Sequence, residues 1–119
     1  MATIVKRKLS GSTDGKPILV VATATAGTTI HTAVAGTTAG TFDEIWLYAY
    51  NGHVDSVQLT IEFGGATVPD QNIILTVAVK SGLILVVPGL ILQNGMVVKA
   101  FAGTANVITL SGFINSITD

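Results

Sequence analysis

The chain has 119 residues, of which 49% are hydrophobic and only 11% are charged, and its net charge is −1. A typical soluble domain is about 25% charged, so this composition indicates a subunit that shows much of its surface to other proteins, where charges would be desolvated. The small net charge excludes a general affinity for nucleic acid or acidic lipid, and the lack of cysteine excludes disulfides and thiolate chemistry.

The N-terminal segment, residues 1–16, is basic. Four cations oppose one acid in it: Lys6, Arg7, Lys8 and Lys16 against Asp14, a net charge of +3. The rest of the chain has a net charge of −4. Two interpretations stay open: a basic arm that docks on an acidic protein surface or a neighbouring copy, or an edge strand protected from further pairing by its cations. We expect no signal peptide, because Asp14 interrupts the pattern and the apolar stretch after it is short.

Alternation of apolar and polar residues runs along the chain, and helical periodicity is almost absent. The expected strands are 3–9, 17–24, 28–34, 43–50, 56–63, 72–79, 83–87, 96–102 and 106–114. Short strands at near-regular spacing, separated by glycine-rich turns, predict an all-β fold. We expect a single domain over 1–119, an antiparallel β-sandwich or jelly-roll-like fold of eight or nine short strands.

Turn residues separate the expected strands. Asp14-Gly15, Asn51-Gly52 and Asn94-Gly95 are dipeptides that favour the primed turns of tight hairpins. Residues 22–42 are rich in Ala, Thr and Gly, which suits either a flexible contact loop or a small-residue strand between two turns.

An aromatic row marks the expected strand 43–50. Trp46, Tyr48 and Tyr50 alternate with aliphatic residues, so they share one face of that strand. Trp and Tyr often anchor protein interfaces, and a central strand buried on both faces has the same pattern. A sugar-binding platform is less well supported, because such a site would add nearby carboxylates and amides that the sequence does not identify.

The expected strand 83–87 is apolar on both faces. Alternation places Leu83, Leu85 and Val87 on one side. A strand of this kind has to be covered twice, by its own chain or by a neighbouring copy, and left bare it would promote aggregation. We therefore expect obligate assembly, with either the aromatic row or this strand at the contact between copies.

The sequence offers no recognisable catalytic or metal-binding motif. His31 and His53 lie outside any such motif; we expect His31 on a strand surface or interface and His53 in a solvated loop. Asp43 and Glu44 are adjacent and so point to opposite faces of a strand. We therefore predict no enzyme activity, no catalytic residue, no metal and no cofactor. The longest apolar run, 83–92, is far shorter than the roughly 20 residues of a membrane-spanning helix, so we expect no membrane partner.

Four stretches carry a resemblance to a known class of proteins. They are KRKLSGSTDGKPILVVATATAGTTIHTAV (6–34), DEIWLYAYN (43–51), LTIEFGG (59–65) and NGMVVKAFAGTANVITLSGFINSI (94–117). Together they resemble small structural proteins of tailed bacteriophage virions, and most of all the capsid decoration, or cement, proteins. Tail, neck and head-fibre components are similar, and a carbohydrate-binding module that aids host adhesion is a further alternative.

The resemblance implies a β-rich protein that performs no reaction. It would be made in the host cytoplasm and sit on the capsid surface, bind the major capsid protein, and form a homo-oligomer, a trimer in preference to a dimer. In that setting Lys6, Arg7 and Lys8 would meet acidic positions of the coat, and neither nucleic acid nor membrane would be a partner.

Overall fold

The computed structural model describes residues 2–119. These residues form nine strands and no helix. The strands are β1 (Thr3–Lys8), β2 (Ile18–Leu19), β3 (Thr28–Thr32), β4 (Phe42–Asn51), β5 (Val57–Phe63), β6 (Asn72–Val77), β7 (Ile84–Leu92), β8 (Val97–Ala102) and β9 (Ile108–Thr118). The all-β prediction is confirmed.

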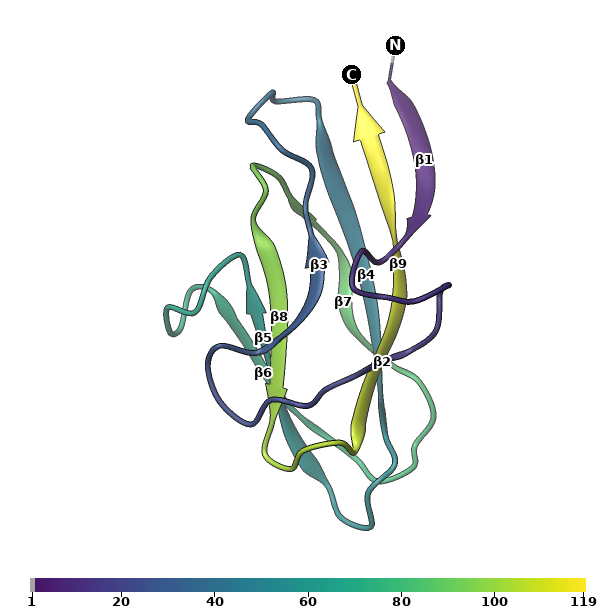
Figure 1. Cartoon of the computed structure of the whole chain (residues 1–119), viewed down its shortest axis with the longest axis vertical. Helices are drawn as coiled ribbons and strands as arrows, with labels where there is room; N and C mark the ends of the chain where they lie inside the picture. Colours follow the sequence, from purple (N-terminus) through teal and green to yellow (C-terminus); the bar gives the residue numbers. More distant parts are fainter. Residues whose placement is uncertain (1) are drawn as a thin grey trace.

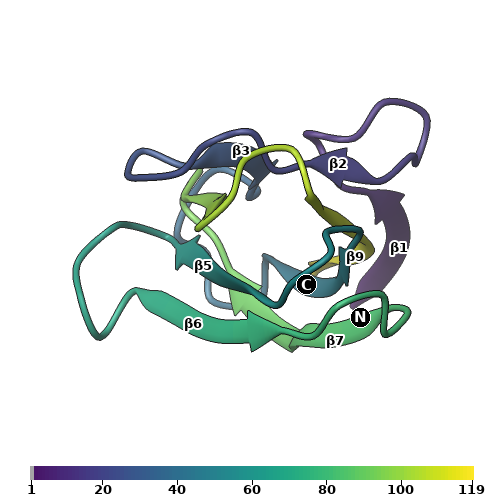
Figure 2. The ribbon, with the colours of Figure 1, turned by 90° about the horizontal axis from the view of Figure 1, so that it is seen from below.

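Two antiparallel sheets pack face to face. Sheet A has the order β1-β9-β4-β7, with β2 also paired to β9, and sheet B has the order β3-β8-β5-β6 (Figure 1). Figure 2, which looks along the longest axis, shows the strands of the two sheets on opposite sides of the molecule. Alternate residues of β4 and β8 are buried, and the core between the sheets includes Leu47, Leu59 and Leu110, all fully buried.

The strand pairs are nested as in a jelly roll. β5 pairs with β6 at the centre of the chain, and outside this pair β4 pairs with β7, β3 with β8, and β1 with β9. This is a long antiparallel ribbon rolled over itself, which places successive pairs of the nest alternately in sheet B and sheet A. The jelly-roll-like prediction is therefore confirmed at the level of strand order.

The predicted hairpin turns are wrong in one respect. Asp14, Gly15, Asn94 and Gly95 all have positive φ, as a primed turn requires. Yet β1 does not pair with β2, and β7 does not pair with β8. The turn at Asn51-Gly52 likewise connects a strand of sheet A to one of sheet B. Local turn geometry reverses the chain, but the rolled topology decides which strand is the hydrogen-bonded neighbour.

Strand β7 departs from simple alternation. It is an edge strand of sheet A, and its pairing with β4 shifts twice, so that Tyr48 lies opposite Leu85 while Leu47 lies opposite Val87. Such bulges place an extra residue in one strand and change which face later residues occupy. Val87 is fully buried and Leu85 is 44% exposed. The prediction that Leu83, Leu85 and Val87 share one face is therefore wrong for Val87, which belongs to the core.

The basic N-terminal segment begins as an edge strand. From Thr3 opposite Thr118 to Lys8 opposite Phe113, β1 pairs with β9 along its whole length, so both ends of the chain lie at the same end of the molecule (Figure 1). Residues 3–8 are thus integrated into sheet A, in line with the second of the two interpretations.

Candidate functional site

The outer face of sheet A gathers most of the aromatic side chains of the protein. Along β4 the even-numbered residues are half-buried and the odd-numbered ones are buried, so the aromatic row points away from the core. Strand β9 adds Phe113, opposite Trp46, and the edge strands β1 and β7 add Lys6 and Leu85. We call this surface the aromatic face; it consists of Lys6, Glu44, Trp46, Tyr48, Tyr50, Leu85, Phe113 and Asn115.

The rings at the centre of the aromatic face are held in place from several sides. Trp46 stacks on Phe113 with ring centroids 6.1 Å apart and planes inclined by 13°. Gly89 supports the indole from β7, where a Cβ would lie 2.8 Å from the indole Cζ2 atom, and its φ is +78°. The Lys6 ammonium lies 4.2 Å from the Phe113 ring centroid, a cation–π contact. The result is an ordered platform rather than a set of independent side chains.

A carboxylate and an amide lie beside these rings. Glu44 Oε1 accepts hydrogen bonds from the indole N–H of Trp46, at 2.7 Å, and from the side-chain N–H of Asn115, at 3.0 Å. The Trp46 bond and, second, the Asn115 bond lower the pKa of Glu44, because they stabilise its charged form. This is the polar cluster that the sequence did not identify, since Glu44 and Asn115 are 71 residues apart.

The predicted interface residues divide into two groups. Lys6, Trp46, Tyr48, Tyr50 and Leu85 belong to the aromatic face, and Leu83, 62% exposed, directly precedes β7. Lys8, opposite Phe113 and on the same face as Lys6, donates a hydrogen bond to the Ser12 carbonyl. Arg7 is on the other face, opposite the buried Ile114, and Val87 is in the core. The three cations of β1 therefore do not form one patch.

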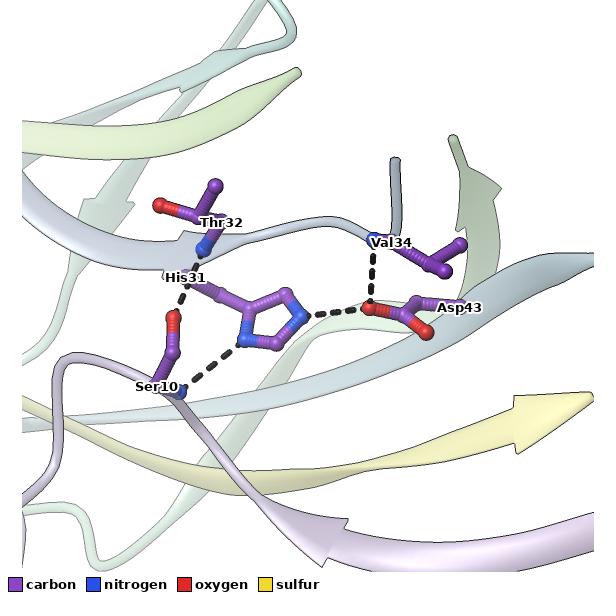
Figure 3. Close-up of polar contacts among 5 residues, drawn as sticks. All are labelled: Ser10, His31, Thr32, Val34 and Asp43. Atoms are coloured by element: carbon purple, nitrogen blue, oxygen red, sulfur yellow. Dashed lines mark hydrogen bonds and ion pairs between the residues drawn. The ribbon is translucent and has the colours of Figure 1, made fainter. Parts of the chain in front are cut away.

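A buried histidine and aspartate form a second polar cluster (Figure 3). His31 Nε2 lies 2.8 Å from Asp43 Oδ2, and Nδ1 accepts a hydrogen bond from the Ser10 backbone N–H at 3.0 Å. The proton is therefore on Nε2, which donates to Asp43. Asp43 Oδ2 also accepts from the Val34 N–H at 3.1 Å. The expectation that His31 lies on a strand surface or at an interface is wrong, because His31 is only 3% exposed.

This cluster differs from a catalytic triad in one decisive contact. Ser10 Oγ accepts a hydrogen bond from the Thr32 N–H at 2.7 Å, while it is the Ser10 backbone that reaches His31 (Figure 3). Nucleophilic catalysis needs the hydroxyl on the base. The contacts instead tie the loop after β1 to β3 and β4. A groove of about 460 Å³ opens beside the pair and is lined by Arg7 and Ser116 among others.

Asp43 and Glu44 do lie on opposite faces of β4, as expected: Asp43 is buried beside His31 and Glu44 lies on the aromatic face. His53 is half-buried in the loop between β4 and β5. In residues 2–119 no group of three or more His, Asp or Glu side chains is placed to hold a metal ion.

Comparisons of the chain with models of protein families, with curated proteins and with solved structures found no match. Within the described residues, no helix is long and apolar enough to cross a membrane. The functional argument therefore rests on the surfaces and contacts described above.

Proposed function

We propose that this chain is a non-enzymatic structural protein of a virion, a decoration protein that binds the outer capsid and reinforces contacts between coat subunits. The observation that carries the proposal is the aromatic face: a rigid, half-exposed array of Trp46, Tyr48, Tyr50 and Phe113 on the outside of sheet A. Trp and Tyr are the side chains most enriched among residues that dominate binding energy.

The surroundings of this face also suit a protein partner. Exposed aliphatic side chains continue along the β7 edge, where Leu83, Leu85, Leu90 and Ile91 are all more than 40% exposed. The opposite edge, β1, carries the cations. An interface with an apolar centre and a polar rim has this distribution. We assign the β7 side to contact between copies and the β1 side to acidic positions of the major capsid protein.

A protein of this kind acts through binding free energy alone. A standard protein interface buries about 1,600 Å² in total, and a capsid repeats each contact many times, so that modest contacts add up to a durable shell. The resemblance of the sequence to decoration proteins supports the capsid surface as the location and a homo-oligomer, a trimer in preference to a dimer, as the assembled form.

Two matched substitutions test this proposal. Leu85→Lys places a charge on the aromatic face, whereas Ile74→Lys changes a similarly exposed residue, 51% against 44%, on the edge strand β6 of the other sheet. Analytical ultracentrifugation and co-sedimentation with capsids should show weakening of about thirtyfold or more for Leu85→Lys, which corresponds to about 2 kcal/mol, and little change for Ile74→Lys. A wild-type protein that stays monomeric at micromolar concentration and does not co-sediment with capsids would contradict the proposal.

A second candidate function is carbohydrate binding by the same face. The observation in its favour is the Glu44–Asn115 pair beside the aromatic row, since a carboxylate and an amide supply directed hydrogen bonds next to flat apolar rings. Glycan-array binding that disappears in Tyr48→Ala or Tyr50→Ala would support this function, provided that the variants keep their fold. Binding to capsids with no glycan signal would favour the structural function instead.

A further inference from the structure

A pocket opens on sheet B, away from the aromatic face. Its volume is about 280 Å³, close to the lower end of the range for small-molecule sites, roughly 300 Å³. Strands β5 and β8 contribute Glu62, Val97 and Lys99, the loop before β3 contributes Ala26, and the connections after β5 and before β8 contribute Ala66 and Met96. Most of the accessible surface of the pocket is apolar, and its lining includes one acid and one base.

The acid and the base lie directly opposite each other. Glu62 on β5 and Lys99 on β8 are register partners, and directly opposite residues of an antiparallel pair present their side chains on the same face. Such a pair would ordinarily form a cross-strand ion pair. Here Glu62 Oε2 is buried without any hydrogen-bond partner, so the Lys99 ammonium does not reach it.

The rest of Glu62 is firmly positioned. Its Oε1 accepts a hydrogen bond from the Gly27 N–H at 2.7 Å, and the residue as a whole is 2% exposed. Gly27 can approach this closely because it has no side chain: a Cβ there would lie 2.6 Å from the Ala100 backbone. A buried carboxylate oxygen without a donor has lost its hydration and gained no hydrogen bond in return, and a donor from a ligand would remove that cost.

We propose that this pocket binds a small zwitterion that carries an ammonium and a carboxylate close together, namely a free aliphatic α-amino acid. Its ammonium donates to Glu62 Oε2, its carboxylate accepts from Lys99, and its side chain packs against Ala26, Ala66 and Met96. The ligand thereby closes the Glu62–Lys99 pair through charge-assisted hydrogen bonds at both ends.

The two opposite charges of the pocket select against ligands with one charge. A simple amine would satisfy Glu62 but face Lys99, and a simple carboxylic acid would satisfy Lys99 but face Glu62. A neutral sugar would gain neither charge-assisted bond. The pocket also contains no aromatic ring on which a sugar could stack.

The test is a titration of the ¹⁵N-labelled full chain with L-leucine, followed by amide chemical shifts. The parallel probes are 3-methylbutylamine, 4-methylpentanoic acid and glucose, which respectively lack the carboxylate, the ammonium and both. Leucine should shift the amides around Gly27, Glu62, Gly65 and Lys99, and each parallel probe should bind at least about tenfold more weakly, because it loses one charge-assisted bond or both.

Two variants and two controls complete the experiment. Glu62→Gln keeps an acceptor for the Gly27 N–H, so the fold should persist, and Lys99→Gln removes the base; each should weaken leucine binding at least about tenfold. Asp70→Asn and Lys16→Gln, both at exposed positions, should bind leucine as the wild type does.

Three results would overturn the proposal. The first is that the amides around the pocket do not shift even in a leucine-saturated solution. The second is that the amine, the acid or glucose binds as strongly as leucine, and the third is that correctly folded Glu62→Gln and Lys99→Gln variants bind leucine as the wild type does. None of these outcomes depends on the aromatic face, so they leave the proposed structural function to its own test.

Discussion

Replacing Asp43 with alanine should lower the free energy of unfolding by about 2–4 kcal/mol. The Asp43 carboxylate accepts hydrogen bonds from the His31 Nε2–H at 2.8 Å and from the Val34 N–H at 3.1 Å. His31 and Asp43 are 3% and 4% exposed, so the imidazole donor would be left buried and unpaired, at a cost of about 1–3 kcal/mol. The half-buried Val34 donor adds a smaller cost, and the space left by the carboxyl group adds the remainder.

Two further substitutions separate geometry from charge. Asp43→Asn keeps an oxygen that can accept from both donors, so it should lose only the ionic strengthening of those bonds, about 1 kcal/mol. Asp55→Ala removes an exposed acid in the loop between β4 and β5 and should change stability by no more than about 0.5 kcal/mol.

Urea unfolding followed by the fluorescence of the single tryptophan, Trp46, measures these differences. It should be repeated at two protein concentrations, because the apparent stability of an oligomer depends on concentration. If Asp43→Ala is as stable as the wild type, or if Asp43→Asn is destabilised as much as Asp43→Ala, the hydrogen-bond account of this cluster is wrong.

Three other predictions follow from individual contacts. Carbon-13 NMR titration should place the Glu44 pKa below its ordinary value, and Trp46→Phe should raise that pKa more than Asn115→Ala does. Because the stabilisation from a lowered pKa is complete only above the ordinary value, wild-type stability should fall as the pH drops from the ordinary value through the lowered one, and Glu44→Gln should reduce this loss. Gly112→Ala should cost about 3 kcal/mol or more in urea unfolding, since its Cβ would meet the Trp46 carbonyl oxygen well inside van der Waals contact; a stability equal to that of the wild type would show that β9 can move away from β4 freely. Leu47→Ala should cost about 2–5 kcal/mol because Leu47 is fully buried, and a loss below about 1 kcal/mol would mean that the core collapses around the missing side chain.

The aromatic face was only partly predictable. Alternation alone placed Trp46, Tyr48 and Tyr50 on one side of β4, because side chains of a strand change face at every residue. Which of the two faces of β4 points into the core depends on which face the other sheet covers. The Glu44–Asn115 bond and the stacking of Phe113 on Trp46 join residues far apart in the chain, so no local pattern could reveal them.

The wrong predictions for Val87 and His31 also arise because long-range contacts decide which residues are buried. Leu85 and Val87 obey a two-residue period in sequence, but a bulge in β7 puts them on opposite faces. His31 lies among polar and small residues and was expected at a surface, yet Asp43 and the Ser10 backbone satisfy both of its ring nitrogens in the interior. Burial of a polar group depends on partners, and partners are supplied by the tertiary structure.

By itself, the sequence determined that the chain forms short strands, where most of them run, and that positive-φ turns lie between some of them, because these depend on neighbouring residues: the alternation of side chains and the conformational freedom of Gly and Asn. Only the tertiary structure decided how the strands pair, which faces are buried, and which acids meet which partners. Nested pairing brings β1 beside β9, and the rolling of the ribbon brings β5 beside β8, which places Glu62 opposite Lys99. Such contacts join residues far apart in the chain and are selected by the packing of the whole sandwich rather than by any segment of it.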